Sequence, residues 1–160
     1  MKKTILYRDP GDEHRDSEPI SVTSWDSFKH HAKLLNELAR AIGHWRERIG
    51  FVTGWSNFAE KIALIHSELS EAFEEFRYAA DATREEASRA EGDQSKVVLE
   101  DQGKFLIIPR SRLDALSEEL ADTAIRLLDL ADGLGIDLGH AILEKMGRND
   151  RRTYRHGKER

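Results

Sequence analysis

Four glutamates lie within the ten residues of SELSEAFEEF, residues 67–76. A helix advances about 100° per residue, which places Glu68, Glu71 and Glu75 within an arc of about 60°. The apolar side chains of the same stretch occupy the adjoining sector of the helix. The acidic stripe therefore borders the expected buried face, whereas an ordinary solvated stripe would oppose it.

The same arrangement recurs in SEELADTAIRLLDLADGLG, residues 117–135. Glu119 and Asp122 stand three residues apart, on the same side of an apolar stripe as the first acidic pair. If the two helices pack against each other, four carboxylates converge at the edge of the helical core. A single ExxE pair is common on solvated surfaces, but two pairs that both border a buried face are more specific.

Converging carboxylates repel one another and lose hydration, which costs several kcal/mol for each uncompensated buried charge. A hard divalent cation is the usual compensation, and a set of oxygen ligands favours Mg²⁺, with Mn²⁺ as the alternative. The sequence therefore predicts a magnesium site whose ligands are Glu68, Glu71, Glu119 and Asp122. Glu75, one helical turn further on, is expected either as an outer ligand or as a group that positions a water.

A basic segment ends the chain. Residues 145–160 carry a formal charge of +5, whereas the whole chain carries −5. Lys145, Arg148 and Arg152 share a face if the last helix continues, and Asn149 lies close to that face. These side chains are expected to bind phosphate oxygens of a polyphosphate held on the metal. Trp55 is a candidate for stacking on a base, although tryptophans more often belong to a core or an interface.

Arginines and lysines with a tyrosine are also typical of nonspecific nucleic-acid binders. The tail is short, however, and the body of the chain is acidic, which would oppose a duplex. Nucleic acid is therefore the less favoured partner.

Composition sets the broad class. A chain of 160 residues fits one domain. It has no cysteine, so disulfides and thiolate metal sites are excluded, and it has no apolar run long enough for a signal peptide or a membrane span. We expect a cytoplasmic protein with no membrane partner.

Hydrophobic periodicity and turn residues predict an all-α fold with four helices. Residues 1–20 are expected to form a flexible arm, and residues 21–160 a single domain. A small hairpin around the turn at Gln102 and Gly103 is predicted between the second and third helices, and the polar residues 81–95 are expected to be a loop or a frayed helix. The helices are expected at residues 24–48, 56–78, 111–134 and 137–149, with Ser24, Asn57, Ser111 and Asp137 near their starts, and with Phe28, Leu34, Leu35, Leu38 and Ile42 as the buried face of the first helix.

Three stretches together resemble the MazG-like nucleotide pyrophosphohydrolases of the all-α NTP pyrophosphatase superfamily. They are EKIALIHSELSEAFEEFR, SEELADTAIRLLDLADGLGIDL and KMGRNDRRTYRHGK, and the likeness covers roughly residues 55–158. By position, the four proposed ligands match the family's metal motif, and Lys145, Asn149 and Arg152 match its phosphate-facing end. Many relatives have a further Glu where this chain has Ser67, and the gap between Glu71 and Glu119 is long.

The resemblance implies a four-helix bundle-like enzyme, a homodimer or homotetramer. It would use Mg²⁺ to hydrolyse a nucleoside or deoxynucleoside triphosphate between the α and β phosphates, giving the monophosphate and pyrophosphate. Glu71 or Glu75 is expected to hold the attacking water. Two alternatives stay open: a noncatalytic helical interaction protein whose tail binds nucleic acid, and a module that binds the nucleotide without turnover.

Overall fold

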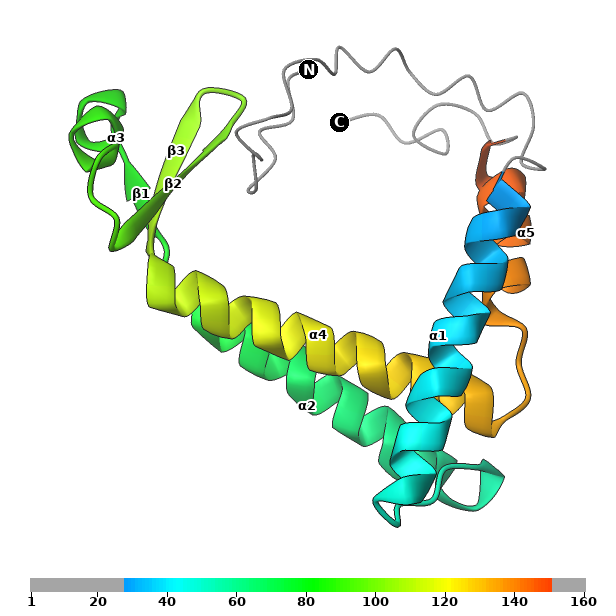
Figure 1. Ribbon diagram of the computed structural model, residues 1–160. Coiled ribbons are helices and arrows are strands. Elements are labelled where there is room, and N and C mark those ends of the chain that lie inside the picture. Colours follow the sequence, from blue (N-terminus) through cyan, green and yellow to red (C-terminus); the bar gives the residue numbers. More distant parts are fainter. Residues whose placement is uncertain (1–27, 151–160) are drawn as a thin grey trace. The chain divides into compact units, whose positions relative to one another are not determined.

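The computed structural model describes residues 28–150 and shows a mostly helical protein with a small antiparallel sheet (Figure 1). The N-terminal residues and the last ten residues lie outside the described part, as do the predicted arm, Ser24 and Arg152. In chain order the elements are α1 (Lys29–Arg48), the 3₁₀-helix η2 (Trp55–Asn57), α2 (Phe58–Phe76), β1 (Ala80–Ala82), α3 (Arg84–Ala90), β2 (Lys96–Asp101), β3 (Lys104–Pro109), α4 (Arg110–Gly133) and α5 (Leu138–Asp150).

These elements form two compact units. Within the described residues, unit 1 comprises 63–123, and unit 2 comprises 28–62 together with 124–150. In unit 1, the segments of α2 and α4 run side by side (Figure 1). Glu68 lies beside Glu119, and Glu75, further along α2, pairs with Arg112, which is earlier in α4. The two helices are therefore antiparallel.

The predicted hairpin is confirmed, and it belongs to a three-stranded sheet with the order β1-β3-β2. Its two-residue turn has Gln102 at φ 51° and Gly103 at φ 80°. Positive φ at both central residues is typical of a type I′ turn, whose twist matches that of the flanking strands. Pro109 is the last residue of β3.

The stretch 81–95, predicted as a loop or a frayed helix, instead contains the end of β1 and all of α3. Thr83 caps α3: the backbone N–H of Glu86 donates to the Thr83 hydroxyl, and the Glu86 carboxylate accepts from the Thr83 backbone N–H at 2.8 Å. This reciprocal capping box satisfies two donors that would otherwise lack partners. α3 packs against the sheet through Ala87, and Ile108 on β3 has no exposed surface.

In unit 2, α1 packs closely against α5. A methyl group on Gly139 would lie 2.3 Å from the backbone oxygen of Ala32, so only glycine fits at this contact. The predicted cap of the last helix is confirmed, because the Asp137 carboxylate accepts from the His140 backbone N–H at 2.8 Å. It also accepts from the Asn36 side chain at 2.7 Å, which ties α1 to the start of α5.

The predicted buried face of α1 is only partly right. Leu34 and Leu38 are about half exposed, whereas Ala39, Gly43 and Arg46 are buried. α5 and α4 approach α1 closely, and only small residues of α1 fit at these contacts. The buried surface of α1 therefore lies to one side of Leu34 and Leu38. Arg46 is buried because it has an ionic partner there.

That partner is Asp129 on α4, whose carboxylate oxygen Oδ1 lies 2.5 Å from Arg46 Nε. The other oxygen of Asp129 accepts from the Thr53 hydroxyl at 2.5 Å. All three residues are 7% exposed. This buried network joins α1, the segment before η2, and the C-terminal half of α4.

Two helix starts differ from the sequence predictions. The helix expected from residue 56 begins as the 3₁₀-helix η2 and becomes α-helical at Phe58. The Asn57 side-chain oxygen accepts from the Gly54 backbone N–H, and its amide donates to the Val52 carbonyl. α4 begins at Arg110 and places Ser111 inside the helix, because the chain passes from Pro109 directly into helix. Within residues 28–150 no helix is both long and apolar enough to cross a membrane.

Candidate metal centre

Unit 1 brings together three of the four carboxylates predicted as metal ligands. Glu68 and Glu71 stand three residues apart on α2, and Glu119 faces them from α4. One oxygen from each lies within 4.8 Å of the others. Neighbouring ligands of an octahedral Mg²⁺ ion are about 2.9 Å apart, so these oxygens would have to approach one another by up to about 2 Å to bind one ion. The donor set therefore fits a hard divalent cation, and side-chain rotation supplies the remaining approach.

The three carboxylates differ in their contact with solvent. Glu68 is 7% exposed, Glu119 is half-buried and Glu71 is exposed. A buried carboxylate beside two others is unfavourable unless a proton or a cation compensates it. The cluster is thus closed on the Glu68 side and open to solvent on the Glu71 side.

The pKa of Glu119 is raised above its usual range. The largest cause is burial, followed by a hydrogen bond with Glu68 that favours the protonated form. The negative charges of Glu71, Glu68 and Asp122 raise the pKa further. A proton on Glu119 therefore relieves part of the repulsion among these carboxylates.

Asp122, the fourth predicted ligand, lies one turn beyond Glu119 on α4 and is exposed. It is not among the three carboxylates whose oxygens converge, although its charge acts on Glu119. It therefore lies close enough to influence the cluster from its open side.

A serine hydroxyl orients Glu71. Ser67, one turn earlier on α2, donates from its hydroxyl to the Glu71 carboxylate at 3.1 Å. This contact occurs at the position where the resemblance would place a further glutamate. Ser67 thus holds one oxygen of Glu71 and leaves the other available.

Glu75 is engaged elsewhere. Both of its oxygens accept from Arg112 Nη1, at 3.0 and 3.3 Å. The Arg112 guanidinium also stacks on the ring of Tyr78, 3.8 Å from the ring centre. The pKa of Arg112 is raised, chiefly by the hydrogen bond with Glu75.

Sequence reasoning missed Arg112, although a signal was present. Arg112 precedes Glu119 by seven residues, and Glu75 follows Glu68 by seven. Seven residues are nearly two helical turns, so each residue lies on the same stripe as its acidic neighbour. Two antiparallel helices that pair Glu68 with Glu119 must therefore also bring Glu75 to Arg112.

The other predicted site residues that the structure describes lie in unit 2. Lys145, Arg148 and Asn149 are exposed on α5, and Arg148 donates to the Glu144 carboxylate at 3.3 Å. Trp55 is 73% exposed in η2, and its ring lies 6.0 Å from that of Phe58. Trp55 is thus not a core residue, which leaves its indole accessible.

Comparison with known proteins adds no assignment, because no family model, curated protein or solved structure matches the chain. The fold and the site together define a mostly helical protein with a carboxylate cluster between two antiparallel helices. Any function must be inferred from that cluster.

Proposed function

We propose that this protein is a Mg²⁺-dependent nucleoside triphosphate pyrophosphohydrolase of the MazG-like type. It would convert a nucleoside or deoxynucleoside triphosphate to the monophosphate and pyrophosphate. The observation that carries the proposal is the convergence of Glu68, Glu71 and Glu119, and the raised pKa of Glu119 agrees with crowded negative charge. Mn²⁺ is the alternative ion, since it accepts the same oxygen ligands.

In this proposal Glu68, Glu71 and Glu119 bind the cation, and Asp122 contributes from the open side. When bound, the ion would lower the pKa of a water and offset charge on the phosphate oxygens. Glu71 is the favoured group for positioning that water, because it is exposed and held by Ser67. Glu75 would first have to leave its ion pair with Arg112.

The roles of Lys145, Arg148, Asn149 and Arg152 in phosphate binding remain proposals from the sequence, as does base stacking by Trp55. Arg148 pairs with Glu144 in an exposed contact, and such contacts contribute little stability. A phosphate group could replace Glu144 as its partner at little cost.

The test of catalysis is pyrophosphate release from all canonical and several modified triphosphates, with and without Mg²⁺. Substituting Glu71→Gln together with Asp122→Asn is expected to abolish release. Glu118→Gln is a matched control, because Glu118 is an exposed glutamate of α4, the helix of Asp122, and lies outside the cluster. Wild-type hydrolysis by the double variant would show that the catalytic assignment is wrong.

A second measurement separates hydrolysis from binding alone. Thermal unfolding of the full chain is recorded with increasing Mg²⁺, because a ligand that binds only the folded state raises the melting temperature. Glu119→Gln is expected to remove this stabilisation. If Mg²⁺ and a nonhydrolysable triphosphate both bind but no pyrophosphate appears, the protein is a nucleotide-binding module; salt-sensitive DNA retardation without either would favour the nucleic-acid alternative.

We also propose that the protein is a homo-oligomer, a homodimer or a homotetramer. Leu69, Phe73 and Phe76 form an exposed row on α2, with exposed fractions of 45, 62 and 42%. Exposed apolar rows of this kind are typical of surfaces that contact another protein. We call these three residues the α2 apolar row; Phe73→Glu is expected to lower the molecular mass in solution.

A further inference from the structure

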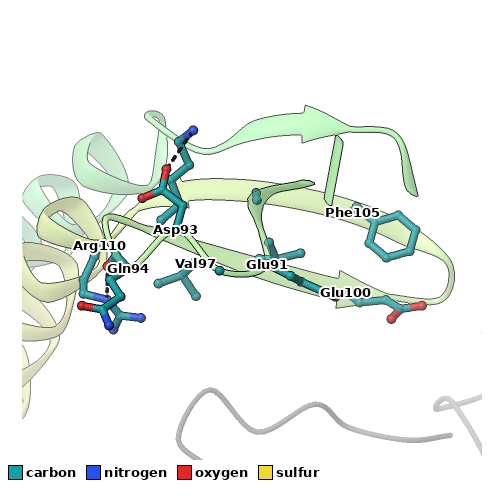
Figure 2. Close-up of a pocket in the computed structure, with 11 residues that line it drawn as sticks. Glu91, Asp93, Gln94, Val97, Glu100, Phe105 and Arg110 are labelled. Atoms are coloured by element: carbon teal, nitrogen blue, oxygen red, sulfur yellow. Dashed lines mark hydrogen bonds and ion pairs between the residues drawn. The ribbon is translucent and has the colours of Figure 1, made fainter. Parts of the chain in front are cut away.

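The outer edge of β2 is a second surface of interest. Within residues 28–150, β2 pairs with β3 alone, so no described strand covers its other edge. A hollow of about 540 Å³ lies along this strand. Figure 2 shows its lining residues spread along β2, from Asp93, Gln94 and Arg110 at one end to Glu100 and Phe105 at the other.

The hollow borders β2 and the segment that leads into it. Val97 and Val98 line it on the strand, and Ala90, Glu91 and Gly92 line it at the end of α3. Because no described strand pairs with this side of β2, an incoming strand would meet the outward backbone groups of β2.

The hairpin geometry shows which backbone groups point outward. In a two-residue hairpin the closing pair, here Asp101 and Lys104, is hydrogen-bonded, and the following pairs alternate. Lys96, Val98 and Glu100 consequently direct their N–H and C=O groups away from β3. Two observations agree: Lys96 is opposite Pro109, which has no N–H, and the Lys96 N–H donates to the Asp93 carbonyl at 3.0 Å.

This alternation restricts how a second copy can pair. In an antiparallel pair, residues whose backbone groups point away from β3 must face the same kind of residue in the partner. These residues all have even numbers, so the numbers of each facing pair sum to an even value. One such register, with Val98 opposite Val98 of the partner subunit, is fully complementary. It sets Lys96 opposite Glu100 of the partner subunit and Val97 opposite Leu99 of the partner subunit, and two-fold symmetry repeats both pairs.

Shifting the register by two residues loses this match. One shift places Val98 opposite Glu100 of the partner subunit, and the other places Lys96 opposite Val98 of the partner subunit. Charges on an edge strand usually prevent pairing. Here the charges have opposite sign and stand at equal distances from Val98, so they attract in this register. They face uncharged residues after a shift of two, and they face like charges after a shift of four.

We propose that the β2 edge is a subunit interface, at which a second copy of this chain pairs antiparallel about a two-fold axis through Val98. Val98 and Glu100 donate four backbone hydrogen bonds across the axis, to Val98 and Lys96 carbonyls of the opposite subunit. The interface is isologous, as expected for a two-fold contact. It is separate from the α2 apolar row and does not depend on the proposed hydrolysis.

Charge exchange tests the interface. Glu100→Lys sets lysine against lysine twice, and Lys96→Glu sets glutamate against glutamate twice. Each variant alone is expected to raise the dissociation constant of this contact at least tenfold, seen by sedimentation velocity as half the wild-type mass. An equimolar mixture of the two variants is expected to recover the wild-type mass, because each supplies the charge that the other needs.

A backbone variant supplies the second measurement. Val98→Pro removes an N–H that faces away from β3, so the hairpin ladder keeps its bonds while the pairing across the axis loses two. We expect unchanged far-UV circular dichroism and half the wild-type mass. A wild-type chain that is monomeric from micromolar to near-millimolar concentration would overturn the proposal, and so would a mass unaffected by these substitutions or a mixture that fails to recover it.

Discussion

Asp129 offers the sharpest test of how unit 2 is held together. Replacing it by asparagine keeps the shape of the side chain and keeps an oxygen that can accept from the Thr53 hydroxyl. It removes the negative charge from the only carboxylate within 3 Å of Arg46 among the described residues. The guanidinium would remain 7% exposed and lose its main partner.

The expected loss follows from the distances. With an effective dielectric constant near 20, two unit charges attract by about 7 kcal/mol at 2.5 Å and about 4 kcal/mol at 3.8 Å. Asp132 and Glu47 each lie 3.8 Å from Arg46 and remain in the variant. Removing one partner of a buried pair typically costs about 3–5 kcal/mol, and the two remaining carboxylates favour the lower end, about 3 kcal/mol.

This loss is measured by urea unfolding, followed by circular dichroism at neutral pH. For a chain of this size, about 3 kcal/mol corresponds to a decrease in melting temperature of about 6–12 °C. Asp114→Asn is the control, an exposed aspartate of the same helix whose loss should cost less than about 0.5 kcal/mol. Adding Arg46→Met to Asp129→Asn should restore part of the stability, because the uncompensated charge is gone.

Two results would refute this reasoning. The first is a cost below about 1 kcal/mol for Asp129→Asn, which would mean that the pair contributes little beyond its desolvation cost. The second is a double variant that loses the sum of the two single losses, which would mean that the buried charge is not the cause.

Three further outcomes are expected. Gly139→Ala should destabilise by about 1–3 kcal/mol, because its methyl group would meet the Ala32 backbone, whereas Gly92→Ala has open space and should stay within about 0.5 kcal/mol in the same melts. Thr83→Ala should destabilise α3 by about 1 kcal/mol, seen as faster amide hydrogen exchange in that helix alone. Because the pKa of Glu119 is raised, the metal-free protein should lose stability as the pH rises above the usual glutamate range. The affinity for Mg²⁺ should rise over the same pH range, because the carboxylate loses its proton. The melting temperature, recorded from pH about 4 to about 8, should therefore fall with pH without Mg²⁺ and rise with pH in its presence.

Local sequence signals predicted the regular elements well where the signal was strong. The long periodic helices, the Gln102-Gly103 turn and the Asp137 cap all occur as predicted. α3 was missed because its seven residues are polar and too short to show a period. Its capping box at Thr83 and Glu86 was the available signal.

The carboxylate cluster was also readable in part. Helical spacing placed Glu68, Glu71 and Glu119 on facing stripes, and the same spacing would have found Arg112. It did not distinguish Asp122 from the three convergent groups. That distinction depends on the relative height of the two helices, which side-chain packing sets.

The amino-acid sequence by itself determined which faces of α2 and α4 carry charge, because a helix fixes the angle between residues. It also indicated the hairpin through Gly103, because glycine readily adopts the positive φ that a type I′ turn requires, whereas Gln102 adopts it without that preference. Only the tertiary structure decided that Arg46 and Asp129 are buried together, that Glu75 pairs with Arg112, and which edge of β2 is uncovered. These features join residues far apart in the chain, and their geometry exists only once the elements have packed.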